Sequence, residues 1–212
     1  MISLLHPSRG RPHQSYATIK KWIDRSGIDD FEVIISIDND DSTQDKYFEL
    51  YTNSIACTIM QRDNKNAIGA INRAARIAQG NIMIVVSDDT DCFHGWAKKI
   101  LAATENKTDF VVKTWDGIQK KMITMPVLDR AYYNRDGYIY NPAYDHLFAD
   151  KEFSEVAYKR KCVIRKPGLK FPHNHYSING KAPDEVHLKN ELTYTQGKKL
   201  FLERQKINFG LK

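Results

Sequence analysis

Three aspartates at the end of an apolar run are the residues of this sequence best suited to chemistry. The run 84–86 (Ile-Val-Val) is followed almost at once by Asp88, Asp89 and Asp91. Carboxylates this close repel one another, and a bound divalent cation relieves that repulsion. A hard cation such as Mg²⁺ or Mn²⁺ takes oxygen ligands and commonly bridges to substrate phosphates. We therefore expect a metal-bound, phosphate-bearing substrate here; the alternative is a solvated loop that caps a helix beginning at Trp96.

The position of this acidic cluster follows from the run before it. The segment 82–86 is short, apolar and rich in β-branched residues, which indicates a buried parallel strand. A second apolar segment, 31–37, also ends in acids, beginning with Asp38. Ligands of open α/β sheets bind in the crevice beyond the carboxyl ends of the strands. Both acidic segments are therefore expected at the ligand-binding edge of one sheet.

Alternating strand and helix patterns predict the elements that hold these residues. Strands are expected over 2–6, 31–37, 55–60, 82–86 and 110–113, and helices over 16–25, 67–79 and 96–104. The alternation favours an α/β fold with a mostly parallel sheet flanked by helices. Later in the chain we expect a strand over 122–127 and helices over 128–135, 152–160 and 192–206. The tyrosines between 132 and 144 are predicted to be core residues, with an acceptor platform as the alternative.

Length and composition limit the class of protein. The chain has 212 residues, which suits a single domain over 1–212, with about 1–113 binding a nucleotide and about 114–212 binding an acceptor. Its three cysteines form no CxxC pair, so we expect neither a zinc site nor a disulfide framework, and a reducing cytoplasm fits. No apolar run approaches the ~20 residues of a membrane span. The net charge of +6 is only weak evidence for a phosphate, nucleic-acid or membrane partner.

The order of these segments resembles a small GT-A-fold glycosyltransferase of the inverting family-two type. The resemblance rests on a first strand followed by a loop with Pro and Arg, a second strand ending in Asp38, and the segment 64–72 (Asn-Lys-Asn-Ala-Ile-Gly-Ala-Ile-Asn). Ser87-Asp88-Asp89 is similar to the family's "DXD" motif, and 147–153 (Leu-Phe-Ala-Asp-Lys-Glu-Phe) to its acidic segment with the catalytic base. The sequence departs from the family's pattern in two places. It has Ser-Asp-Asp-Thr-Asp in place of Asp-x-Asp, and it lacks the family's frequent Gln/Arg-x-x-Arg-Trp element.

The resemblance implies a metal site closed by a histidine from the second half of the chain. Asp89 would ligate Mn²⁺ or Mg²⁺, and Asp91 is a possible second ligand. Either His173 or His175 would complete the site, and neutral imidazole suits Mn²⁺ better than Mg²⁺. Which aspartate and which histidine bind the metal stays open, and both histidines have a structural alternative.

The resemblance also implies a nucleotide site at the first two strand ends. The loop Pro7, Ser8 and Arg9 would bind the base and ribose, and Arg9 is suited to stacking or to gripping phosphate. Asp38 would accept the N3–H of uracil, because a carboxylate only accepts, which points to a UDP-sugar. Lys65 would contact the nucleotide, and Asp88 would contact the ribose or a metal-bound water. The alternatives are a turn at Asp38 and a solvated surface lysine at Lys65.

Two acids in the segment 147–153 are the catalytic candidates implied by the resemblance. Asp150 would act as general base and deprotonate the acceptor hydroxyl as it attacks the anomeric carbon with inversion. A positioned base typically contributes ~10²–10⁴-fold in rate. Glu152 would orient the acceptor or substitute as base, and Asp145 is the reserve candidate. The alternative is that Asp150 merely caps a helix.

The expected function is metal-dependent, hexosyltransferase-like transfer of a sugar from a nucleotide diphosphate, with a UDP-sugar favoured. The acceptor is a hydroxyl group of a saccharide or of modified nucleic acid. A nucleotidyltransferase is the nearest alternative, but it needs a Gly-rich loop, and the loop 7–12 has one glycine. A non-catalytic nucleic-acid-binding protein is the other, but it needs a basic stripe, and the basic residues here are scattered.

Overall fold

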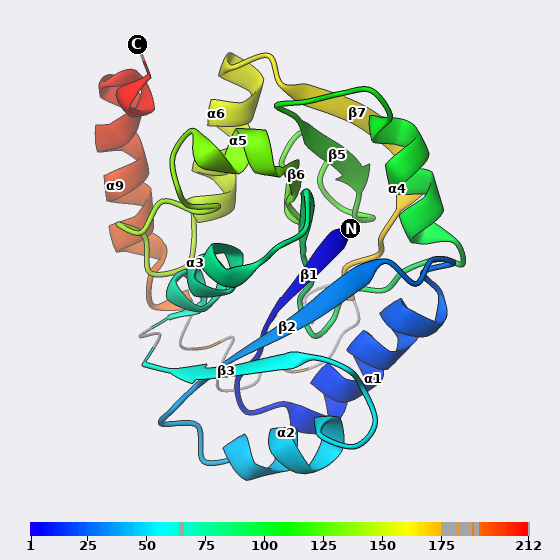
Figure 1. Cartoon of the computed structure of the whole chain (residues 1–212). Coiled ribbons are helices and arrows are strands. Elements are labelled where there is room, and N and C mark those ends of the chain that lie inside the picture. Colours follow the sequence, from blue (N-terminus) through cyan, green and yellow to red (C-terminus); the bar gives the residue numbers. More distant parts are fainter. Residues whose placement is uncertain (64–65, 175–181, 183–187, 189–190, 212) are drawn as a thin grey trace.

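A seven-stranded, mostly parallel sheet forms the centre of the described part of the chain (Figure 1). The computed structural model describes residues 1–63, 66–174, 182, 188 and 191–211. The strand order is β3-β2-β1-β4-β6-β5-β7, and only β6 runs antiparallel to its neighbours. The strands are β1 (Ile2–Pro7), β2 (Phe31–Asp38), β3 (Thr58–Arg62), β4 (Ile82–Val85), β5 (Val111–Trp115), β6 (Val127–Asp129) and β7 (Val163–Lys170). The expected fold class is confirmed.

Helices cover both faces of this sheet (Figure 1). Apolar residues of α1 (Pro12–Asp24), α2 (Gln44–Tyr51) and α4 (Trp96–Thr104) share one buried core with one face of the strands. Those of α3 (Ala67–Ile77), α5 (Arg130–Asn134), α6 (Ala149–Lys159) and α9 (Tyr194–Lys206) share the other, together with the short 3₁₀ helix η1 (Asn208–Gly210). Successive strand residues face opposite sides, so Leu4 lies in the first core and Leu5 in the second. No helix in the described ranges is long and apolar enough to cross a bilayer.

The order of the strands creates a crevice between the ends of β1 and β4. From β1 the chain continues to β2 and β3 on one side, whereas β4 lies on the other. Such a reversal separates the loops that leave the two central strands, and ligands bind there. The loop after β1 meets the loop after β4, where the Ser8 hydroxyl donates to Asp88 at 2.8 Å. The acidic cluster therefore lies at this reversal point.

Aromatic packing returns the segment after β7 to the same edge of the sheet. Phe171 is fully buried and stacks on Trp22 of α1 with ring centroids 5.3 Å apart. The indole nitrogen of Trp22 in turn donates to the carbonyl of Thr90 at 3.0 Å. Trp22 thus holds the acidic loop and the segment that leads to His173 against one another.

The second half of the chain differs from the sequence-based expectation. The predicted strand over 122–127 is wrong, because the strand there, β6, begins only at Val127 and then leads into α5. Asp116 holds the preceding loop by accepting the N–H groups of Ile118 and Gln119. Helix α2 and strand β7 were not expected. Pro167 and Gly168 within β7 argue against a central strand, and β7 indeed lies at the sheet edge.

Candidate active site

Asp89 and His173 face each other at the carboxyl edge of the sheet. Nε2 of His173 lies 3.1 Å from both carboxylate oxygens of Asp89. The backbone holds this pair from both sides, since Thr90 and His173 form an antiparallel bridge and the Asn174 N–H donates to the Asp89 carbonyl at 2.9 Å. The structure therefore brings together one predicted carboxylate and one predicted histidine of the metal site.

The two side chains stabilise each other's charge. Burial alone would raise the pKa of Asp89, but the hydrogen bond and charge of His173, with the Ser87 hydroxyl, lower it to about 2. Burial would likewise lower the pKa of His173, but the bond to Asp89 and its charge outweigh this, and the pKa rises above 6.5. The charges of Asp116 and Asp150 act in the same direction on His173. These aspartates therefore share the electrostatic environment of the pair.

Asp88 is directed toward the loop after β1. Its buried carboxylate accepts the Ser8 hydroxyl at 2.8 Å and lies 3.1 Å from Nε2 of His6. Its carbonyl accepts the Thr18 hydroxyl at 2.6 Å. Asp88 thus connects the loop after β4 to the end of β1 and the loop after it, a position from which it can orient a bound nucleotide.

Asp91 is directed away from the pair formed by Asp89 and His173. Its carboxylate lies 3.3 Å from the Lys21 ammonium and 3.4 Å from the Arg25 guanidinium. It also accepts the Cys92 N–H at 2.7 Å. The donors around Asp91 are cations and an amide, which compete with a metal ion for its oxygens.

The donor set at this edge fits a metal ion that also binds the substrate. Within the described ranges, no three His, Cys, Asp or Glu side chains gather as a complete metal site. Asp89 and His173 offer a carboxylate and an imidazole, a set suited to Mn²⁺, whose remaining positions phosphates and water can fill. His175 lies outside the described residues.

The loop after β1 is built on Arg9 and its acidic partners. The Arg9 guanidinium donates to Asp38 at 2.6 Å and to Asp40 at 2.5 Å, and these bonds raise its pKa. Pro7 ends β1, and the Ser8 hydroxyl also bonds the Tyr47 phenol at 2.7 Å. The structure thus joins the predicted residues of the first and second strand ends. Lys65 lies outside the described residues.

Asp150 lies in the first turn of α6, close to the charge of His173. Burial raises the pKa of its carboxyl, and the Lys151 N–H, at 2.8 Å, and the charge of His173 offset this only in part. A carboxylate with a raised pKa is a stronger base than an exposed one. Its position and environment therefore suit a proton acceptor.

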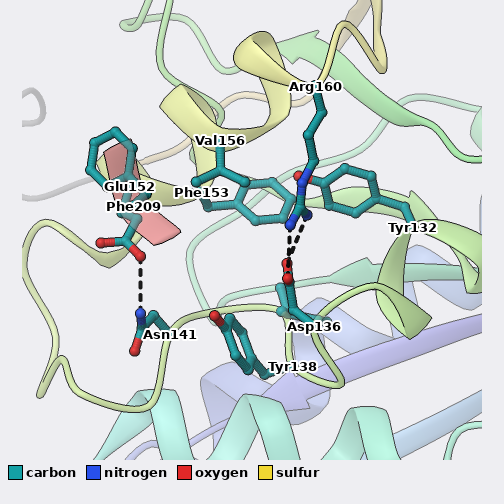
Figure 2. A pocket seen from close by; sticks show the side chains of 10 residues that line it. Tyr132, Asp136, Tyr138, Asn141, Glu152, Phe153, Val156, Arg160 and Phe209 are labelled. Carbon is teal, nitrogen blue, oxygen red and sulfur yellow. Dashed lines mark hydrogen bonds and ion pairs between the residues drawn. The ribbon is translucent and has the colours of Figure 1, made fainter. Parts of the chain in front are cut away.

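Glu152 differs from Asp150 in its surroundings. Figure 2 shows Glu152 in a pocket, with a hydrogen bond to Asn141. Its buried carboxylate accepts Nε of Arg204 at 2.7 Å, the Tyr144 hydroxyl at 2.7 Å and the Asn141 amide at 3.0 Å. It lines a small cavity of about 30 Å³ between α5, α6 and η1, and its bonds fasten α9 to α6. These bonds occupy the carboxylate, so the structure indicates a structural role. Asp145, the reserve candidate, accepts from the Asn66 amide at 3.2 Å.

Asp116 is a residue of this region that the sequence analysis missed. Its buried carboxylate accepts the Ile118 and Gln119 N–H groups and the Thr124 hydroxyl, while its carbonyl accepts the His173 N–H at 2.9 Å. It therefore positions His173. The signal was an Asp-Gly pair directly after a strand, which is typical of a turn at a strand end.

A hollow of about 280 Å³ adjoins the acidic loop on the side of α1. Its lining is formed by α1, the loop after β4 and the segment after β7, and comprises Gln14, Thr18, Lys21, Asp88, Asp89, Thr90, Asp91 and Asn174. The lining is mostly polar and borders Asp89. The crevice between the ends of β1 and β4 is therefore open next to Asp89.

Comparison with known proteins decides the family. The model of the family described as "Glycosyl transferase family 2" matches residues 7–185, a range that includes every site residue discussed above except the structural partner Arg204 and the residue His6. The chain belongs to glycosyl transferase family 2. This confirms the resemblance and the enzyme class expected from the sequence. No curated protein matches this family-2 chain significantly.

Solved structures agree with the family-2 fold. TarS of S. aureus in complex with UDP has a TM-score of 0.66 and 15% identity, and the match covers 80% of this chain and 59% of that one. A mannosyltransferase from Pyrobaculum calidifontis, in complex with GDP-Man and Mn²⁺, has a TM-score of 0.65 and 12% identity, with 88% of this chain and 58% of that one covered. The family-2 chain thus spans less than two thirds of either structure, and at these identities the likeness shows the fold.

Proposed function

We propose that this family-2 chain transfers a sugar from a nucleotide diphosphate donor to a hydroxyl acceptor with the help of a divalent metal ion. The observation that carries the proposal is the pair formed by Asp89 and His173 at the reversal point of the sheet, 3.1 Å apart. An oxygen and a nitrogen ligand at this edge suit a metal ion that also binds a diphosphate. When bound, such an ion stabilises the charge that develops on the leaving nucleotide diphosphate.

The donor is proposed to be a UDP-sugar. Asp38 ends β2 beside the crevice, and the bond from Arg9 at 2.6 Å holds its carboxylate in place. A fixed carboxylate can accept the N3–H of uracil. TarS has been solved in complex with UDP and with UDP-GlcNAc, which supports a uridine nucleotide, whereas the mannosyltransferase complex contains GDP-Man.

Transfer is proposed to invert the anomeric carbon, with Asp150 as general base. Asp150 lies in the first turn of α6, close enough to His173 for their charges to interact. A base on the side opposite the diphosphate can take the proton of an acceptor hydroxyl during direct displacement. We propose accordingly that residues after about 113 bind the acceptor and that the preceding residues bind the nucleotide.

Calorimetric titration with and without Mn²⁺ tests the donor and the metal together. UDP, GDP and ADP are titrated into the wild-type protein and into Asp89→Asn, with Asp91→Asn as the matched control from the same loop. We expect Mn²⁺-dependent binding of UDP that Asp89→Asn loses and Asp91→Asn retains. Unchanged Mn²⁺-dependent binding in Asp89→Asn would contradict the metal assignment, and a preference for GDP would contradict the assigned base.

A further inference from the structure

Three exposed cations lie together on the side of the molecule where the acceptor is proposed to bind. Lys120 and Lys121 belong to the loop between β5 and β6, and Arg165 belongs to the edge strand β7. We call these three residues the loop patch. None of them forms an ion pair with an acid among the described residues, unlike the exposed Lys20 and Lys46, which pair with Asp24 and Glu49.

Tyr158 of α6 joins the members of the loop patch. Its hydroxyl donates to the carbonyl of Lys121 at 2.9 Å, and the guanidinium of Arg165 lies over its ring, 5.1 Å from the centroid. Lys113, opposite Arg165 in the β5–β7 register, donates to the carbonyl of Gln119 at 2.9 Å. The backbone of Lys121 and the guanidinium of Arg165 thus contact the same side chain of α6, and the three exposed cations belong to neighbouring segments.

The same loop leads directly to the proposed catalytic residues. At its start, Asp116 contacts the backbone of His173 at 2.9 Å. Near its end, the Ile123 N–H donates to the Ser154 hydroxyl at 2.8 Å, and that hydroxyl donates to the carbonyl of Asp150 at 2.7 Å. Hydrogen bonds therefore connect the loop that carries Lys120 and Lys121 to His173 at one end and, through Ser154, to Asp150 at the other.

Two buried charged groups lie beneath the loop patch, the carboxylate of Asp116 and the ammonium of Lys113. The carboxylate of Asp116 already accepts two N–H groups and the Thr124 hydroxyl. Burial lowers the pKa of Lys113, and the positive charge of Arg165 lowers it further, although Asp116 acts against both. One buried carboxylate and one buried ammonium thus lie beneath the loop, and the positive charge of the surface comes from the three exposed residues of the loop patch.

We propose that the loop patch binds the acceptor, and that the acceptor is a saccharide carrying anionic groups, carboxylate or phosphate, beside its accepting hydroxyl. This inference depends on the proposed function. A neutral acceptor gains no binding free energy from unpaired cations. An acceptor with repeated anionic groups can form one ion pair with each cation of the loop patch. Single-stranded nucleic acid is disfavoured, because its bases need open aromatic faces, and Arg165 covers the ring of Tyr158.

Binding of labelled oligosaccharides tests the proposal. Fluorescence anisotropy is measured with a fluorescein-labelled oligogalacturonate and with a maltooligosaccharide of the same length. We expect wild-type protein to bind the oligogalacturonate more tightly, with Kd rising with salt at a logarithmic slope of about 2 for three ion pairs. The variant Lys120→Glu/Lys121→Glu/Arg165→Glu should bind it at least about tenfold more weakly, because three exposed pairs are each replaced by repulsion.

A matched variant separates the site from the overall charge. Lys198→Glu/Lys199→Glu/Lys206→Glu makes the same change of net charge on exposed residues of α9. It should retain oligogalacturonate binding; an equal loss in both variants would overturn the proposal. Tighter binding of a labelled single-stranded oligonucleotide of matched charge would overturn it as well. The milder variant Lys120→Gln/Lys121→Gln/Arg165→Gln replaces the charge-reversal variant if thermal unfolding shows that the latter does not fold.

Failure of this inference can be told from failure of the proposed function. Mn²⁺-dependent UDP binding is measured on the same wild-type preparation. If UDP binds but the oligogalacturonate binds no better than the maltooligosaccharide, only the acceptor class is wrong. If UDP does not bind with or without Mn²⁺, the proposed function itself is wrong.

Discussion

The imidazole of His173 lies 3.1 Å from both carboxylate oxygens of Asp89, although 84 positions separate the two residues in the sequence. The contact connects the loop after β4 to the segment after β7. It joins the part of the chain proposed to bind the nucleotide to the part proposed to bind the acceptor. The pair is thus both a candidate metal site and a link within the fold.

This pair should make the stability of the metal-free protein depend on pH. The pKa of His173 is raised above 6.5, so its contribution is fully present below that value and is lost as pH rises through the raised pKa. The pKa of Asp89 is lowered to about 2, so its contribution is present above 3.8 and is lost as pH falls toward 2. Between 3.8 and 6.5 both contributions are complete.

Urea unfolding in EDTA, with His173→Asn as the variant, measures this dependence. The difference in the free energy of unfolding between wild type and variant should be larger at about pH 5.5 than at about pH 9. A difference that is the same at both pH values would show that the pair contributes no charge-dependent stability.

Asp150→Asn should impair transfer without removing the donor site. Loss of a positioned general base lowers the transfer rate by ~10²–10⁴-fold. In wild type, the rate should rise with pH through a pKa above 3.8, because burial raises the pKa of this carboxyl. Titration of UDP with Mn²⁺ checks donor binding, and Asp145→Asn is measured beside it because Asp145 is the reserve candidate for the base. Near-normal transfer by Asp150→Asn would assign the base elsewhere.

Asp38→Asn should weaken UDP binding more than Asp40→Asn. Both carboxylates bond Arg9, but the Asp38 side chain is 13% exposed and lies at the strand end, whereas that of Asp40 is 72% exposed. A hydrogen bond to a charged group contributes about 1.5–3 kcal/mol, which corresponds to about a 10–100-fold change in Kd. Calorimetry of both variants measures the difference. Equal effects would show that the two residues act only through Arg9.

Arg204→Met should destabilise the fold because it leaves the buried carboxylate of Glu152 without its cation. The side chains are 21% and 5% exposed, and removing one partner of a buried pair costs about 3 kcal/mol or more. The double variant Glu152→Leu/Arg204→Met should recover part of this loss, since no unpaired charge remains. Urea unfolding of the three proteins measures both effects. A single variant as stable as wild type would contradict the structural role of Glu152.

Local sequence patterns were sufficient to predict most of the first half of the fold. The helix over 96–104 was predicted with the bounds that α4 has, and the strand over 82–86 corresponds closely to β4. Helix α1 begins at Pro12, before the expected position 16, because proline is well tolerated in a first helical turn. Strand periodicity, capping residues and turn residues lie within a few positions of one another, so the sequence displays them directly.

Contacts between distant segments were decided only by the tertiary structure. The sequence placed Asp89 at a strand end and offered His173 as a candidate ligand, but the contact between the two depends on where β7 lies in the sheet. It also offered Asp150 as the general base and Glu152 as a residue that orients the acceptor or substitutes for it, and only the packing of α9 gives Glu152 the cation Arg204. Residue types and local periodicity thus determined which chemistry was available. The order of the strands and the packing of the helices decided which of those groups meet, because such contacts join residues that no local pattern connects.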